Sequence, residues 1–164
     1  MAKYNKIIFL DIDGVLNVIP QGYDEFGGIF HEHFVENLKW IIDETAAKIV
    51  ISSSWRLSGL EYCRKMWSTR KLPGEIIDMT PCEGINLKRG TLEGDDRGYE
   101  IQHWLDNNEV ENYVILDDDK DMLVSQMNNF VLTSNNPDHD ESIDGYGYGL
   151  TKECAQMAIN ILNS

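Results

Sequence analysis

With 164 residues, of which 42% are hydrophobic and 26% charged, the chain has the size and composition of one globular domain with its own core. Its net charge of −14 at pH 7 repels polyphosphate backbones, so extended nonspecific nucleic-acid binding is not expected, although a local phosphate pocket lined by a few arginines stays open. No apolar run approaches the roughly 20 residues of a membrane span, which argues against a membrane protein.

The first residues and the cysteines both indicate a cytoplasmic protein. The segment MAKYNK leads directly into an apolar run and has no features of a secretory signal peptide. Cys63, Cys82 and Cys154 lie far apart, without a CxxC pair or zinc-ligand spacing, which is typical of reduced thiols. We therefore expect a single cytoplasmic domain over residues 1–164.

Short apolar runs alternate with amphipathic helical patterns along the chain. The runs IIFL, KIVI and YVIL are rich in apolar, β-forming residues and do not alternate with polar ones, as in parallel strands that are buried on both faces. In chain order the predicted elements are a strand at 7–10, a helix at 33–44, strands at 48–51 and, more weakly marked, at 75–78, a helix at 98–106, a strand at 113–116, a helix at 119–127, a strand at 130–133 and a last helix after Thr151. This alternation predicts an α/β fold with a mostly parallel central sheet.

Three stretches contain turn-forming residues and no clear periodicity. Residues 17–31 and 79–97 each contain a proline and several glycines, and they form either lids over a pocket or ordinary surface loops. Residues 134–149 are the third such stretch, and we expect them to be mobile.

Polar residues directly follow three of the predicted strands. In chain order these polar segments are Asp11–Asp13, Ser52–Ser54 and Asp117–Asp119. Ligands of open parallel α/β sheets bind at the carboxyl ends of the strands, so we expect these side chains to meet at one edge of the sheet.

This predicted edge has the chemistry of phosphoryl transfer with Mg²⁺. Magnesium prefers hard oxygen ligands and takes only a few carboxylates besides water and substrate phosphate. Asp11, one or both of Asp117 and Asp118, and the backbone carbonyl of Asp13 are the predicted ligands. The metal would offset the repulsion between these carboxylates and an incoming phosphate dianion.

The two acids after the first strand have separate predicted roles. Asp11, its charge screened by the metal, would attack phosphorus and form an aspartyl-phosphate. Asp13 would protonate the leaving oxygen and then activate the water that hydrolyses the intermediate, while Gly14 permits the sharp turn after the strand. For the hydroxyl that binds a phosphoryl oxygen, Ser52 is the first candidate and Ser53 the second.

The transferring group also needs a cation, because its oxygens carry negative charge that must be stabilised. Arg97, just before the predicted helix at 98–106, is the first candidate, and Arg56 in SSSWR is the second. Lys88 and Arg89 are further candidates.

The motifs DIDGVLN, IVISSS and YVILDDDKD resemble motifs one, two and four of the haloacid-dehalogenase-like (HAD) phosphatase superfamily. This resemblance implies a Rossmann-like three-layer α/β fold, Mg²⁺ as cofactor and an aspartyl-phosphate intermediate. Carried over by position, it implies a nucleophile at Asp11, a general acid and base at Asp13, phosphate binding by Ser52 and metal binding by Asp117 and Asp118. Asp121 matches a supporting acidic position of many members.

The segments SSSWR, RGYEIQHWL, YVILDD and GLT are more closely similar to the HAD domain found in Swiss Army Knife RNA repair proteins. Arg97 of RGYEI stands where the wider superfamily usually has a lysine, and an arginine can bind phosphate through two hydrogen bonds. The chain is too short for a large cap domain, so we expect a small cap or none and an open pocket. The resemblance implies a nucleotide or nucleic-acid terminal phosphate as substrate, with a small phosphorylated molecule as the alternative.

Three other function classes are alternatives to a phosphatase. A receiver-like signalling module has paired acids after its first strand and a lysine after its last, whereas here the adjacent acids come late and FVLT leads to Ser134. A catalytically degenerate HAD-like module that only binds phosphate would not need Asp11, Asp13 and Asp117 intact, and a dehalogenase does not need Asp13. We therefore predict an enzyme, a HAD-type phosphatase.

Overall fold

A five-stranded parallel sheet forms the centre of the protein in the computed structural model, which describes residues 1–18, 20, 22–81, 96–133 and 149–164. The strand order is β5-β4-β1-β6-β7, and every neighbouring pair is parallel. The strands are β1 (Lys3–Leu10), β4 (Lys48–Ile51), β5 (Ile76–Met79), β6 (Glu109–Asp117) and β7 (Phe130–Leu132). A separate antiparallel hairpin consists of β2 (Tyr23–Asp24) and β3 (Gly27–Gly28).

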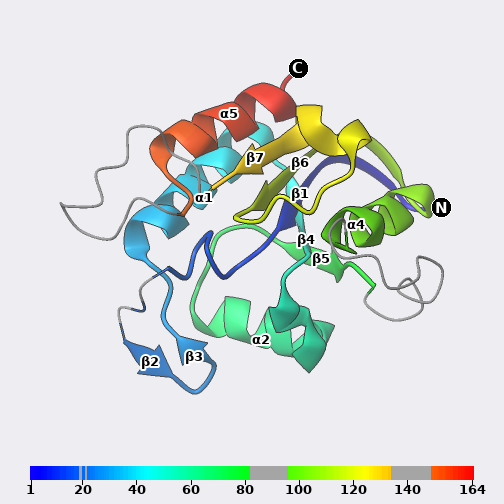
Figure 1. Cartoon of the computed structure of the whole chain (residues 1–164). Coiled ribbons are helices and arrows are strands. Elements are labelled where there is room, and N and C mark those ends of the chain that lie inside the picture. The colour runs from blue at the N-terminus through cyan, green and yellow to red at the C-terminus, as the bar shows by residue number, and fades with distance from the viewer. Residues whose placement is uncertain (19, 21, 82–95, 134–148) are drawn as a thin grey trace.

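Helices cover both faces of the sheet and complete three layers (Figure 1). The helices and 3₁₀ turns are α1 (Glu32–Thr45), η1 (Ser54–Ser58), α2 (Leu60–Thr69), α4 (Asp96–Asp106), η2 (Val124–Asn129) and α5 (Lys152–Leu162). Residues of α1, α2 and α5 pack in one hydrophobic cluster, and those of α4 pack in the other. No helix of the described residues is long and apolar enough to cross a membrane.

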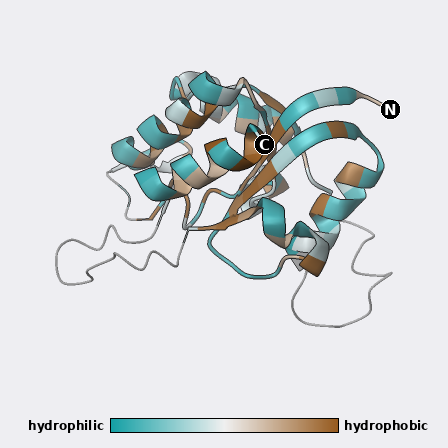
Figure 2. Ribbon diagram, turned by 90° about the horizontal axis from the view of Figure 1, so that it is seen from above, coloured by the Kyte–Doolittle hydropathy of each residue, from teal (hydrophilic) through white to brown (hydrophobic). Residues whose placement is uncertain are grey.

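Strand β1 is buried on both faces, because its side chains alternate between the two clusters. Ile8 and Leu10 pack on the side of α1 and α5, whereas Ile7 and Phe9 pack on the side of α4. All four side chains are fully buried. The hydrophobic colour in Figure 2 accordingly concentrates on the central strands, while the helices alternate between polar and apolar residues.

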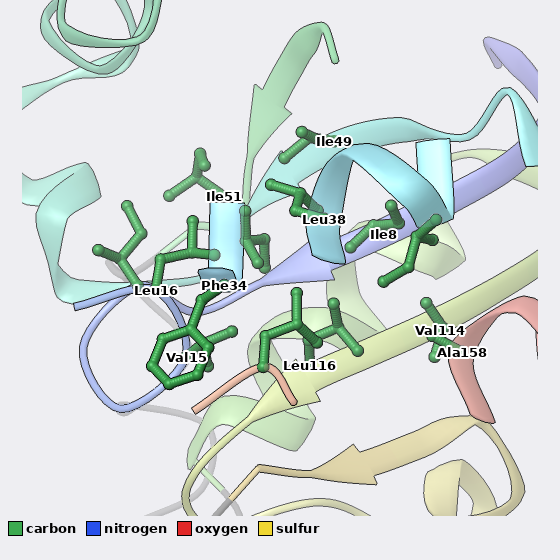
Figure 3. Packing of buried hydrophobic residues seen from close by; sticks show 14 of the residues in the cluster. Ile8, Val15, Leu16, Phe34, Leu38, Ile49, Ile51, Val114, Leu116 and Ala158 are labelled. Carbon is green, nitrogen blue, oxygen red and sulfur yellow. The ribbon is translucent and has the colours of Figure 1, made fainter. Parts of the chain in front are cut away.

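The turn after β1 is anchored in the same core. Val15 and Leu16 are fully buried and lie beside Phe34 of α1 (Figure 3). The backbone N–H of Asn17 and that of Leu16 both donate to the carbonyl of Ile12, which closes the turn. The residues just after β1 are therefore held by core packing, which fixes the direction in which the chain leaves the strand.

The predicted fold class is confirmed, and most predicted elements match the structure. The five predicted strands all occur in the sheet, α1 and α4 cover the predicted helices, and Thr151 caps α5 by accepting a hydrogen bond from the N–H of Cys154. The described thiols, Cys63 and Cys154, are both free. The stretch predicted as irregular at 17–31 contains the β2–β3 hairpin, and the structure places no separate cap domain among its described residues. Residues 82–95 and 134–148 lie outside the description, and with them Lys88, Arg89 and Cys82.

The prediction of a helix at 119–127 is wrong. Residues 119–123 are irregular there, and a 3₁₀ turn, η2, follows. This segment forms hydrogen bonds with the start of α4 instead of helical ones. The carbonyl of Asp121 accepts from the N–H of Gly98, and the side-chain amide of Gln126 donates to the carbonyl of Gly98. Val124 is 91% exposed and Met122 is buried, so the apolar residues do not share one helical face.

Candidate active site

The carboxyl ends of β4, β1 and β6 lie side by side and bring the predicted site residues to one edge. The hydrogen-bond ladder continues one residue beyond the strands: Asp11 donates its N–H to Leu116, and Ser52 donates to Leu10, each at 3.0 Å. Asp117 ends β6 itself. This continuation locks the three segments in register at the point where their polar side chains emerge.

Three carboxylates form a cluster at this edge. Asp11, Asp117 and Asp118 each offer a carboxylate oxygen, and these oxygens lie within 4.8 Å of one another. Asp11 is 6% exposed and Asp117 only 1%. Oδ2 of Asp117 is buried without a hydrogen-bond partner among the described residues. Such buried acids need a compensating positive charge, and their hard oxygen donors fit a divalent cation such as Mg²⁺.

The pKa values of the two buried acids show how poorly this charge is balanced. Burial raises the pKa of Asp11 to about 7, against the lowering effects of Arg97 and of hydrogen bonds from the Ile12 backbone and the Ser53 hydroxyl. Burial, followed by repulsion from Asp11, raises the pKa of Asp117 to about 8. The protein alone therefore favours proton retention in this cluster near neutral pH.

Arg97, the first candidate for the cation, lies over the acidic cluster. Its Nη1 is 3.7 Å from Oδ1 of Asp11 and 3.9 Å from Oδ2 of Asp117. Both distances exceed a hydrogen bond, and Nη1 is buried without a hydrogen-bond partner in the described part of the chain. Arg97 is thus placed to attract both acids while keeping a donor available for another anion.

Asp121 holds the start of α4, and with it Arg97. Its Oδ2 accepts a hydrogen bond from the backbone N–H of Arg97 at 3.3 Å, and its carbonyl accepts from Gly98 at 2.9 Å. A Cβ at Gly98 would lie 2.6 Å from the backbone N of Leu123, so only glycine permits this approach. Burial raises the pKa of Asp121. The predicted supporting acid therefore positions the arginine through the backbone.

The three serines after β4 have different surroundings. Ser52 is fully buried, and its Oγ has no hydrogen-bond partner among the described residues. The hydroxyl of Ser53 donates to Asp11 and also accepts from the N–H of Trp55 at 3.3 Å. Ser54 is exposed. Ser53, the second candidate from sequence, is thus the serine that contacts the predicted nucleophile.

Arg56, the second candidate for the cation, binds the serine turn from inside the protein. Its Nη1 donates to the carbonyls of Ser52 at 3.1 Å and Ser53 at 2.8 Å, and its Nε donates to Thr80 at 3.1 Å. Its Nη2 pairs with Oε2 of Glu100 at 2.7 Å, and the side chain is 5% exposed. These contacts turn the guanidinium toward the backbone, so the geometry favours Arg97 for anion binding.

Sequence reasoning missed Glu100 as a member of this site. The Glu100 carboxylate binds Arg56, and its Oε2 is also 3.8 Å from Nε of Arg97. It therefore links the serine turn to the cation over the acids. Its spacing three residues after Arg97 on a helix was the available signal.

Asp13 is the exposed acid of the site. Its Oδ1 accepts a hydrogen bond from the side chain of Asn17 at 2.8 Å, and its Oδ2 accepts from Nε1 of Trp55 at 3.1 Å. Gly14 has a φ of +81°, as the predicted sharp turn requires. A Cβ at Gly14 would lie 2.1 Å from Oδ2 of Asp118, so glycine also permits the close approach of the turns after β1 and β6.

One known family matches most of the chain. The family model described as the HAD domain in Swiss Army Knife RNA repair proteins matches residues 7–137, well over half of the chain. This range includes all three polar segments and Arg97. Neither the curated proteins nor the solved structures give a significant match. The chain belongs to the HAD domain family of Swiss Army Knife RNA repair proteins.

Proposed function

We propose that the protein is a Mg²⁺-dependent phosphohydrolase that cleaves phosphoric monoesters through an aspartyl-phosphate on Asp11. The observation that carries this proposal is the cluster of Asp11, Asp117 and Asp118 beneath Arg97, at the carboxyl edge of a parallel sheet. Membership in the HAD family supports a phosphatase-type activity.

The metal would be held by Asp11, Asp117, Asp118 and the backbone carbonyl of Asp13. Bound there, Mg²⁺ supplies positive charge that stabilises phosphoryl oxygens and keeps the acids ionised. Oδ2 of Asp117, which has no hydrogen-bond partner among the residues described, supports this assignment, because a buried carboxylate oxygen without a partner is costly unless a cation occupies the site.

Two displacements at phosphorus make up the proposed reaction. A carboxylate oxygen of Asp11 attacks phosphorus, the ester P–O bond breaks, and Asp13 gives its proton to the leaving oxygen. Water then attacks the phosphorus of the aspartyl-phosphate, Asp13 takes a proton from that water, and the P–O bond to Asp11 breaks. Asp13 is exposed beside the buried Asp11, which suits a group that must exchange protons with substrate and water.

Arg97 and a serine hydroxyl are the proposed ligands of the phosphoryl oxygens. Nη1 of Arg97 supports a direct contact, since it lies near both Asp11 and Asp117 and has no hydrogen-bond partner among the described residues. The Ser53 hydroxyl already contacts Asp11, and the hydroxyl of the neighbouring Ser52 has no hydrogen-bond partner in the part of the chain that the structure describes. Arg56 would act through the backbone of these serines instead of through phosphate.

The proposed substrate is the terminal phosphate of a nucleotide or nucleic acid, as the name of the family suggests. The net charge of −14 repels a long polynucleotide and therefore favours a short ligand, or contact with the end of a strand alone. A small phosphomonoester is the alternative. Comparing mononucleotides and 3′- and 5′-phosphorylated oligonucleotides with a sugar phosphate tests this point, and no preference for any nucleotide or nucleic-acid substrate would remove the assignment.

Hydrolysis of p-nitrophenyl phosphate with and without Mg²⁺ tests the activity itself. We expect metal-dependent turnover by the wild type and its loss in Asp11→Asn, which keeps the shape of the side chain and removes the nucleophile. Asp119→Asn is the matched control, because Asp119 is an exposed acid of the same aspartate run outside the cluster. Full activity of Asp11→Asn would disprove the nucleophile. Phosphate binding without any turnover would support the degenerate, phosphate-binding module.

A further inference from the structure

The indole of Trp55 contacts the proposed general acid directly. Its Nε1 donates to Oδ2 of Asp13 at 3.1 Å, while Asn17 occupies the other oxygen. Trp55 belongs to η1, the turn that begins just after the phosphate-binding serines. Its indole N–H therefore fixes the rotation of the Asp13 carboxyl group from the side opposite Asn17.

The other side of the Trp55 indole packs against the region of the β2–β3 hairpin. The Trp55 ring meets Phe30 edge-on, with ring centroids 5.4 Å apart. The guanidinium of Arg70 lies 4.7 Å from the Phe30 ring centroid and 5.9 Å from that of Trp55. A Cβ on Gly27 of β3 would lie 3.8 Å from the indole edge, which places the hairpin backbone beside it.

Arg70 fastens the hairpin to the end of α2. Its Nε and Nη2 form a two-point contact with the carboxylate of Asp24, at 2.9 and 2.6 Å. The same guanidinium donates to the carbonyls of Gly27 and Gly28 at 3.2 and 3.0 Å. The Arg70 side chain is only 7% exposed. Figure 1 shows the hairpin and α2 on the same end of the molecule.

These contacts make a continuous chain from the hairpin to the acid. Asp24 binds Arg70, Arg70 covers Phe30 and Trp55, and Trp55 binds Asp13. The geometry points to Trp55 as a positioning residue for Asp13, held in place by the hairpin through Arg70. The inference rests on the proposed acid role of Asp13 and adds to it the means by which its carboxyl group is aimed at the leaving oxygen.

Such aiming matters only when the leaving group needs a proton. Proton transfer in the transition state requires the acid to lie within hydrogen-bond reach of the leaving oxygen, and small misplacements cost much of its effect. A nitrophenolate leaves readily as an anion, whereas an unsubstituted phenolate is more basic and gains more from protonation. A defect in positioning should therefore depend on the leaving group, while a general loss of folding should not.

The test compares the hydrolysis of phenyl phosphate and of p-nitrophenyl phosphate, which differ little in shape, by the 164-residue chain in the presence of Mg²⁺. In Trp55→Phe, which keeps the aromatic packing and removes the N–H, we expect the ratio of kcat/KM for phenyl to p-nitrophenyl phosphate to fall about tenfold. Because both substrates are measured on one preparation, the ratio does not depend on the folded fraction. Trp67→Phe is the matched control, since the Trp67 indole N–H binds only the Pro73 carbonyl, at 2.9 Å, among the described residues.

Arg70→Met tests the role of the hairpin. We expect the ratio to fall by about threefold, and the double variant with Trp55→Phe to show no further fall, because both changes act through the same contact. An unchanged ratio in Trp55→Phe, or an equal fall in Trp67→Phe, would overturn the positioning role. A further fall in the double variant would overturn the link through Arg70. Absence of any Mg²⁺-dependent wild-type turnover would instead refute the proposed function, and the inference with it.

Discussion

Replacing Glu100 with leucine would leave the buried guanidinium of Arg56 without its charged partner. The two side chains are 11% and 5% exposed, and Oε2 of Glu100 lies 2.7 Å from Nη2 of Arg56. Breaking a buried ion pair by removing one partner costs about 3–5 kcal/mol, since the remaining charge stays desolvated. Arg56 keeps its three carbonyl acceptors on Ser52, Ser53 and Thr80, so we expect a loss near the lower end, about 3 kcal/mol.

Urea unfolding of a double-mutant cycle measures this loss. A change of about 3 kcal/mol in a domain of this size lowers Tm by roughly 10 °C. Glu100→Leu and Arg56→Met should each be strongly destabilising, whereas the double variant should be about 2 kcal/mol more stable than the sum of the two effects predicts. Additive effects, within about 0.5 kcal/mol, would refute the interpretation that the pair acts as a unit.

Three further predictions concern the acidic cluster. Without metal, the free energy of unfolding should fall as pH rises from about 4 to about 8, because the raised pKa values of Asp11 and Asp117 make the folded state bind more protons than the unfolded state over that range. Urea unfolding at several pH values should show a weaker dependence of this free energy on pH in Asp117→Asn, and the same dependence in both proteins would contradict the argument. Gly14→Ala should weaken Mg²⁺ binding, measured by calorimetry, by displacing Asp118, and should destabilise the protein by about 1–2 kcal/mol through its positive φ; unchanged affinity would show that the close approach is dispensable. Arg97→Met should lower kcat/KM about 10²- to 10³-fold, with Arg97→Lys retaining more activity, and a small effect in steady-state assays would remove Arg97 from phosphate binding.

The sheet could be predicted because a strand that is buried on both faces needs apolar residues at successive positions, and this pattern is visible in a short segment of sequence. IIFL, KIVI and YVIL do not alternate between polar and apolar residues, and Lys48 at the start of KIVI is the one charged residue among them. Such non-alternating apolar runs are typical of parallel strands that are buried on both faces. Helix α2 was not predicted, although Leu60, Cys63 and Met66 have helical spacing and the last two are buried. The apolar residues of 119–127 have the same kind of spacing but form no helix, because contacts with the start of α4 use that backbone. Local periodicity does not distinguish these two cases.

The acids of the site followed from one rule of sheet geometry, whereas the roles of the arginines did not. Asp11 and Asp117 each end a buried strand, and parallel strands that are neighbours in a sheet bring such residues together. Arg97 ranked before Arg56 because it precedes the predicted helix at 98–106 and stands where the HAD superfamily usually has a lysine, and neither criterion describes the surroundings of the two side chains. The two arginines differ in their surroundings. The guanidinium of Arg56 donates to backbone carbonyls and to Glu100, whereas Nη1 of Arg97 lies near Asp11 and Asp117 and has no hydrogen-bond partner among the described residues.

The amino-acid sequence alone determined which polar groups follow each strand. Carboxylates follow β1, hydroxyls follow β4, and carboxylates stand at the end of β6 and directly after it. The contacts of Asp13 with Trp55, of Glu100 with both arginines and of Arg70 with the hairpin arise only in the folded protein. Most of these contacts join residues 42 to 46 positions apart, and the one between Arg97 and Glu100 joins helix neighbours three positions apart. The packing of α2 and α4 against the sheet decides which of these side chains meet. Strand ends are encoded locally by hydrophobicity, but the partners of long polar side chains depend on the tertiary arrangement that surrounds them.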